Sequence, residues 1–215
     1  MATRKYEQVL RAEAAAETRR RILEAVGQRL REAPTEQPSL EKVAKLANVS
    51  RSTIYADFGS RAGLFDAFVA DLWDRTGLED LGEAVKSGDA REHLRRGIAA
   101  ASRMKGQEIA IYRVLHAMDR LDPESAGGAV RHMEEDRKAG MKKLAEHLAD
   151  GGVLREDVSK EQAFDALWVL TSFEALDLLV TGRRMSLDRA INTLVNMAER
   201  SVCRPSRSRP PRSKS

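Results

Sequence analysis

The 215-residue sequence predicts an all-α protein in which a small helical head is followed by a larger helical body. Apolar residues recur every three or four positions along almost the whole chain, which is the period of helices with one buried face. No stretch shows the sustained alternation of a half-buried strand. Hydrophobic residues make up 42% of the chain, which is enough to form a folded core.

The first helix is expected from about residue 13, or somewhat earlier, to residue 31. Its buried face is predicted to carry four apolar residues: Ile22, Leu23, Val26 and Leu30. Pro34 and Pro38 then end it, because proline cannot continue the hydrogen-bond ladder of a helix.

A second helix is expected to begin after Ser39, whose hydroxyl can cap it. Asn48 stands where this helix needs a residue that tolerates positive φ, so the chain should turn there. Ser50 can cap a third helix, and Gly59 ends that helix after barely two turns. The sequence therefore predicts a helix, a tight turn and a second short helix.

Ser60 is expected to cap a fourth helix that runs to about Thr76. Five further helices are predicted at 89–105, 107–120, 124–149, 159–181 and 186–202. Asp89 and the pair Ser159 and Gln162 give N-terminal capping signals. We expect three regions: residues 1–59 with an N-terminal arm and the helix-turn-helix, a larger helical body at 60–203, and a basic disordered tail at 204–215.

A helix-turn-helix places its second helix in the major groove of DNA, where the outer side chains of its first turns meet base edges. Four residues occupy those positions here: Arg51, Ser52, Thr53 and Tyr55. Arginine can form two hydrogen bonds with guanine, and hydroxyls bind bases or phosphates. Ser39 and Arg61 stand at helix N-termini suited to phosphate, and a flexible basic run at Arg4 and Lys5 could follow the backbone or the minor groove.

The run SLEKVAKLANVSRSTIYADFGSRAGLFDAF resembles the DNA-binding head of the tetracycline-repressor (TetR) family of transcriptional regulators, and the resemblance extends over residues 17–70. It implies a three-helix head on a divergent helical body that binds a small molecule and forms a homodimer. It also implies contact with double-stranded DNA, Tyr55 and Arg61 chiefly on phosphate, by six residues: Ser39, Arg51, Ser52, Thr53, Tyr55 and Arg61. The protein is then a regulator, most often a repressor, that an effector releases from a palindromic operator.

Two positions depart from the family's pattern. Asn48 replaces the usual turn glycine, and Asp57 stands where histidine or tyrosine is common. A carboxylate repels phosphate, so Asp57 either points away, toward Arg61, or accepts a hydrogen bond from cytosine. Asp57 also sustains the alternative hypothesis of a helical partner-docking protein whose head has lost specific DNA recognition.

Residues 163–180 are apolar on nearly every side, and 187–198 carry an apolar stripe, so two helices from each chain are expected to form a four-helix dimer interface. Its predicted residues are Leu167, Leu170, Leu187, Ile191, Leu194 and Val195. A mostly apolar effector pocket is expected between the middle helices. Its predicted residues are Trp73, Met104, Tyr112, His116 and Phe173.

The sequence predicts no catalytic residues, metal site or cofactor. His132 and Asp136 have the i, i+4 spacing of two metal ligands, but further ligands are not evident. An enzyme of the helical body is a third hypothesis, and it would depend on His116 or His132. The single cysteine, Cys203, and the absence of a signal sequence lead us to expect a cytoplasmic protein without a membrane segment.

Overall fold

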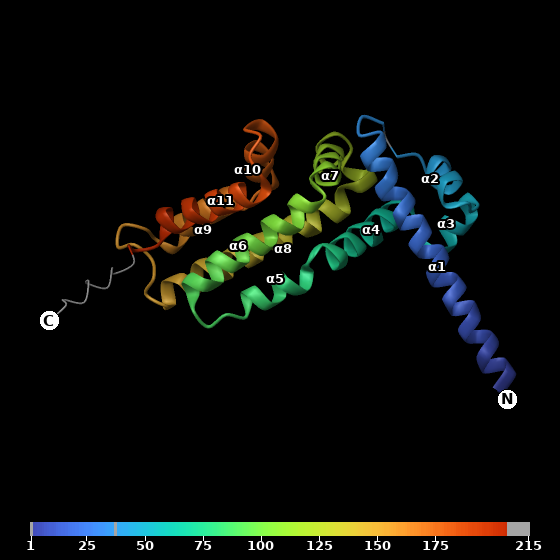
Figure 1. Cartoon of the computed structure of the whole chain (residues 1–215), viewed down its shortest axis with the longest axis horizontal. Helices are drawn as coiled ribbons and strands as arrows, with labels where there is room; N and C mark the ends of the chain where they lie inside the picture. The colour runs from blue at the N-terminus through green and yellow to red at the C-terminus, as the bar shows by residue number, and fades with distance from the viewer. Residues whose placement is uncertain (1, 37, 206–215) are drawn as a thin grey trace. The chain divides into compact units, whose positions relative to one another are not determined.

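A computed structural model describes residues 2–36 and 38–205 of the chain (Figure 1). These residues form helices, and their only extended pairing is the isolated bridge between Leu154 and Cys203. The all-α prediction is confirmed. The chain divides into two compact units, Met1–Leu78 with Gln107–Asp136 and Glu79–Gly106 with Arg137–Ser215, which are described separately. No helix in the described residues combines the length and apolar character needed to cross a membrane.

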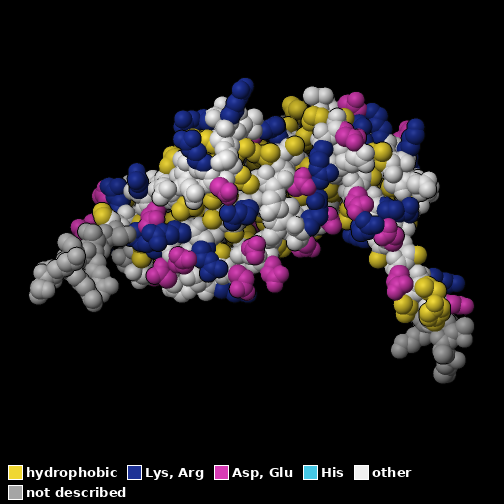
Figure 2. Space-filling view, viewed as in Figure 1, with side chains coloured by type: hydrophobic (Ala, Val, Ile, Leu, Met, Phe, Trp, Pro, Cys, Tyr) yellow, Lys and Arg dark blue, Asp and Glu magenta, His cyan; other side chains and the backbone are white. Residues whose placement is uncertain are grey.

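The first unit contains the predicted head. Its first four helices are α1 (Ala2–Glu32), α2 (Leu40–Ala47), α3 (Arg51–Phe58) and α4 (Arg61–Thr76). Helix α1 starts about eleven residues earlier than predicted, so the backbone before residue 13 is helical and not a flexible arm. Figure 2 shows hydrophobic side chains gathered near the N-terminal end of α1, where Tyr6, Val9 and Leu10 are exposed.

The core of the first unit lies between α1, α4 and α7 (Ile109–Leu121), and α8 (Pro123–Asp150) begins in this unit. Its fully buried side chains include Ile22, Leu30, Ile54, Phe65, Phe68, Leu72, Ile111 and Leu115. Beside this core, Glu108 immediately precedes α7 and accepts hydrogen bonds from Arg31 of α1 and Arg75 of α4. One carboxylate thus joins three helices of the unit.

The second unit contains α5 (Leu78–Val85), α6 (Ala90–Gln107), the end of α8, α9 (Lys160–Leu170), α10 (Phe173–Asp177), the π-helix η1 (Leu178–Gly182) and α11 (Leu187–Val202). Sequence analysis missed α5. The predicted caps at Asp89 and Ser159 are confirmed, because Asp89 accepts from the Glu92 amide and Ser159 forms a capping box with Gln162.

The predicted helix 159–181 is wrong in one respect, because it breaks at Thr171 and Ser172. The Thr171 hydroxyl donates back to Leu167 O at 2.7 Å, and Ser172 caps α10 through the Ala175 amide. Two cations occupy the end of α9: Lys105 Nζ donates to Thr171 O at 2.6 Å, and Arg137 donates to Trp168 O at 2.7 Å. Cations suit the negative end of a helix, so these contacts stabilise the break.

The end of the second unit includes residues that the sequence assigned to the tail. Cys203 is buried and caps α11, while the Arg204 amide donates to Val153 O at 2.9 Å. Arg204 is therefore held by backbone pairing and does not belong to a disordered tail. The rest of the predicted tail from residue 206 onward lies outside the described residues.

Candidate nucleic-acid interface

The turn between α2 and α3 forms as the sequence predicts. Asn48 adopts the left-handed conformation, with φ 52° and ψ 51°, which asparagine tolerates better than most residues. The Asn48 amide donates to Lys45 O and the Val49 amide donates to Ala44 O, so the last carbonyls of α2 are satisfied. Ser39 caps α2 by accepting from the Lys42 amide. The geometry fixes where α3 begins.

A network of hydroxyls holds the first turn of α3. Ser50 Oγ accepts from the Thr53 amide at 3.1 Å, which confirms the predicted cap. The same oxygen lies 2.7 Å from Ser52 Oγ and 2.8 Å from Thr53 Oγ1. Three of the predicted hydroxyls therefore meet at one helix end, where partially positive amides suit an anion.

The outer side of α3 is polar and exposed. Arg51 and Ser52 are exposed, Tyr55 is 44% exposed, and Thr53 is half-buried, while Ile54 faces the core. The structure thus places the four predicted DNA-contacting residues on one short helix, with three of them exposed.

Arg61 begins α4, and its guanidinium lies 5.8 Å from the ring centroid of Phe65. Among the described residues, Arg61 Nε and Nη2 have no hydrogen-bond partner although both atoms are buried. Asp57 is exposed and forms no described ion pair with Arg61, so that alternative for Asp57 is not realised. Arg4 and Lys5 lie on the helical backbone of α1, and their side chains lie outside the described structure.

Sequence analysis missed two residues that position α3. A Cβ atom on Gly63 would lie 2.2 Å from Phe58 O, so the close approach of α4 to the end of α3 requires glycine. Arg19 of α1 donates from Nη1 to Asp57 O at 3.3 Å and stacks over Phe58, with Cζ 4.4 Å from the ring centroid. The glycine in the first turn of a helix was a visible signal, whereas nothing local marked Arg19.

The five predicted effector residues divide between the two units. In the first, Trp73 of α4 lies close to Tyr112 of α7. Burial raises the pKa of Tyr112 above its ordinary value. His116, also in the first unit, is half-buried. Met104 and Phe173 are core residues of the second unit, each 4% exposed.

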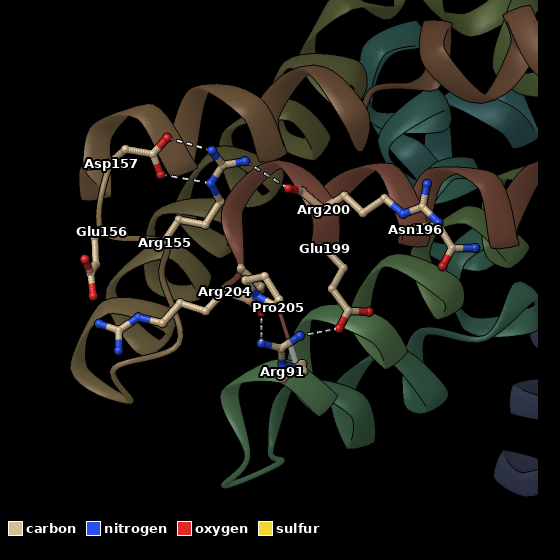
Figure 3. A pocket seen from close by; sticks show the side chains of 10 residues that line it. Arg91, Arg155, Glu156, Asp157, Asn196, Glu199, Arg200, Arg204 and Pro205 are labelled. Carbon is tan, nitrogen blue, oxygen red and sulfur yellow. Dashed lines mark hydrogen bonds and ion pairs between the residues drawn. The ribbon is translucent and has the colours of Figure 1, made fainter. Parts of the chain in front are cut away.

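A groove of about 690 Å³ lies in the second unit and contains none of those five residues. Its walls are charged (Figure 3): Arg91 faces Glu199 at 2.5 Å, and Arg155 makes a two-point contact with Asp157. Arg91 and Arg155 also donate to carbonyls at the end of α11. These two arginines therefore hold the C-terminal end of α11, and the groove differs in chemistry from the apolar pocket that the sequence predicts.

The predicted dimer residues divide by burial. Leu167, Ile191 and Leu194 are at most 3% exposed within their own unit, so the prediction that these side chains meet a partner is not supported. They pack in the core because each occupies the inner side of α9 or α11. Leu170, Leu187 and Val195 are half-buried. Strong exposure falls on four other apolar residues of the second unit, which are Val85 of α5 and Val169, Leu178 and Met197 near the C-terminal end.

Comparison with known proteins agrees with this geometry. Residues 22–68 match the family model described as bacterial regulatory proteins, tetR family. Over 186 residues the chain is 26% identical to the HTH-type transcriptional regulator YdeS of Bacillus subtilis (strain 168). The matched region covers 86% of this chain and 89% of that protein.

Solved structures share the fold. NalD, the secondary repressor of the MexAB-OprM multidrug efflux pump in Pseudomonas aeruginosa, superposes with a TM-score of 0.68 at 22% identity, covering 90% of this chain and 100% of NalD. A TetR transcription regulator from Haloarcula marismortui gives a TM-score of 0.67 at 17% identity, with coverages of 87% and 99%. At these identities the similarity establishes the fold alone.

Proposed function

Since the chain is a TetR-family, DNA-binding transcriptional regulator, we propose that it acts as a homodimeric repressor that binds a palindromic operator and is released by a small-molecule effector. The observation that carries the proposal is the outer side of α3. Arg51, Ser52 and Tyr55 project from a short helix whose first turn is fixed by Ser50. The Arg51 guanidinium has two parallel N–H donors, which suit the edge of a guanine base. The hydroxyls of Ser52 and Tyr55 suit the flanking phosphates.

Phosphate contacts are assigned to residues beside α3. Arg61 is half-buried, and its place at the start of α4 adds the positive end of a helix. Ser39 stands at the equivalent end of α2, and the exposed Tyr55 hydroxyl is accessible from α3. These groups would fix the position of the head on the duplex while Arg51 and Ser52 recognise the sequence.

Dimerisation is assigned to the exposed side of α9, η1 and α11. Val169, Leu178 and Met197 are between 48% and 66% exposed, and they lie on three elements of the second unit. The exposed side of α9 carries Glu161 and Asp165, whereas that of α11 carries Arg189. A two-fold arrangement that pairs α9 with the partner's α11 brings opposite charges together. Two heads would then meet major grooves about 34 to 36 Å apart.

Effector release is assigned to Tyr112, which is buried, and to the half-buried Trp73 beside it. Glu108 lies one helical turn before Tyr112 and accepts a hydrogen bond from Arg31 of α1. A ligand with apolar character that contacts Trp73 and Tyr112 would therefore bind close to the residue that links α7 to α1. Release requires that the effector bind the DNA-free conformation more tightly than the DNA-bound one. The repressor output is supported by the similarity to NalD, which is itself described as a repressor.

The test is selection of bound duplexes from a random DNA pool with the purified protein. We expect an inverted repeat with half-sites one helical turn apart, bound at least about a thousandfold more tightly than scrambled DNA. The affinity should be measured at two salt concentrations. Recovery of no motif, with weak binding that vanishes as salt rises, would show charge attraction only and would favour a partner-docking protein.

A further inference from the structure

We propose that Arg19 is a positioning residue for α3 and thereby for specific DNA recognition. The inference rests on the proposed function and adds a residue that does not itself contact DNA. Arg19 lies on α1, 38 residues before the carbonyl of Asp57 to which it donates. It therefore connects the longest helix of the head to the end of the recognition helix.

Helix α3 needs external support. It has eight residues, whereas an isolated helix shorter than about 12 to 15 residues is marginal in water. Ile54 is its only buried residue, so the packing of α3 provides a single deep anchor. Ser50 caps the N-terminal end of α3. At the C-terminal end, the last carbonyls of the helix need hydrogen-bond donors from outside it.

The C-terminal carbonyls of α3 are satisfied by three different donors. The Gly59 amide donates to Tyr55 O at 2.9 Å, and the Ser60 amide donates to Phe58 O at 2.8 Å. Asp57 O receives the side chain of Arg19 at 3.3 Å. Two of these bonds are local to the turn, so Arg19 supplies the hydrogen bond that ties this end of α3 to α1.

The contact has two components that act in the same place. The Arg19 guanidinium stacks over the Phe58 ring, with 4.4 Å between Cζ and the ring centroid, as in a cation–π interaction. Its positive charge also lies at the negative end of the α3 dipole. Loss of both would let α3 rotate about Ile54, and that rotation would move Arg51 and Ser52 relative to the bases.

The test compares Arg19→Ala with Arg20→Ala on the selected operator and on a scrambled duplex. Arg20 is a matched control because it is the next residue on α1, carries the same charge and pairs only with Glu17 and Glu24 of its own helix in the described structure. For Arg19→Ala we expect the ratio of operator to scrambled affinity to fall about tenfold, with an unchanged salt slope. Arg19→Lys keeps the charge and should recover part of that ratio.

A direct phosphate contact by Arg19 would give another pattern. Affinity for both duplexes would then fall by the same factor, and the salt slope would decrease by about 0.9. That pattern, or no change at all in Arg19→Ala, would overturn the proposal.

A second measurement needs no DNA. Amide hydrogen exchange of the free protein should accelerate at the end of α3 in Arg19→Ala and remain at the wild-type rate in Arg20→Ala. If the wild-type protein selects no operator, the proposed function fails while this measurement still decides whether Arg19 holds α3. Equal exchange in the two variants would reject the positioning role by itself.

Discussion

Arg31 of α1 and Glu108 before α7 form a two-point hydrogen bond, with Nε to Oε2 at 3.1 Å and Nη2 to Oε1 at 2.6 Å. The Glu108 side chain is 18% exposed, so this pair is better shielded from water than an ordinary surface ion pair. Arg75 of α4 shares the same carboxylate at 3.2 Å. The head helix α1 is thereby linked to the two helices that carry Trp73 and Tyr112.

Replacement of Glu108 by Gln should lower the free energy of unfolding by about 1 to 2 kcal/mol, because charge-assisted hydrogen bonds to two arginines are lost. Urea denaturation measures this change. Hydrogen bonding from Arg31 lowers the pKa of the Glu108 carboxyl below 4.5, so its contribution is present above that pH and is lost as the pH falls through the lowered pKa. The exposed Glu146→Gln serves as the control, and equal effects would contradict the assignment.

Replacement of Gly63 by Ala should destabilise the head by about 3 kcal/mol or more, because the new Cβ would lie 2.2 Å from a backbone oxygen that cannot move away freely. Gly140 of α8 has open space at its Cβ position, so Gly140→Ala should stabilise the protein by about 0.5 to 1 kcal/mol. Thermal unfolding of the two variants should therefore shift in opposite directions.

Stability should fall when the pH drops below about 6.5. Burial, and next His147, lower the pKa of His93, whose Nδ1 lies 3.1 Å from His147 Nδ1. In the unfolded chain His93 binds a proton at a pH where the folded protein leaves it neutral. The stability that neutral His93 contributes is therefore complete above the pKa of the unfolded chain, and it is lost as the pH falls through the lowered pKa of the folded protein. In His93→Gln the loss between pH 7 and 5 should shrink, whereas the exposed His132→Gln should keep the wild-type profile.

Arg51→Ala should cost about 1 to 3 kcal/mol on the operator and relax discrimination at one base pair. Arg61→Ala should instead weaken binding to operator and scrambled duplex alike and reduce the salt slope by about one. Both variants are measured by titration against the selected operator and single-base derivatives. An equal loss on every sequence for Arg51→Ala would remove it from the base-contacting residues.

Val169→Asp should shift the chain from dimer to monomer and raise the dimer dissociation constant at least about tenfold, because a carboxylate would be buried without a partner. Light scattering after size-exclusion chromatography gives the mass directly. Val85→Asp is the control, since this valine of α5 is also exposed, at 48%. A dimer that survives Val169→Asp would place the interface elsewhere.

Local chemistry explains which parts of the fold could be predicted. The hydroxyls of Ser39, Ser50 and Ser60 each accept from an amide three residues later, and Asn48 adopts positive φ. Such caps depend on neighbouring residues alone and are visible in a sequence. The prediction of which residues contact bases followed from these boundaries.

Two of the features that were missed depend on residues distant in the chain. The break at Thr171 is completed by Lys105, 66 residues away, and the end of α3 is completed by Arg19. Apolar periodicity also marks both core and interface positions, which is why Leu167 and Ile191 were assigned to a partner although they are buried in their own unit. Only packing separates the two roles.

The burial of Cys203 has a practical use in labelling chemistry. It is the chain's single cysteine, it is 4% exposed, and burial raises the pKa of its thiol, so little of it is in the reactive thiolate form. A cysteine introduced by Ala56→Cys, on the exposed side of α3, would therefore take a maleimide fluorophore selectively without removal of the native one. The dye would report the approach of duplex to the recognition helix in real time.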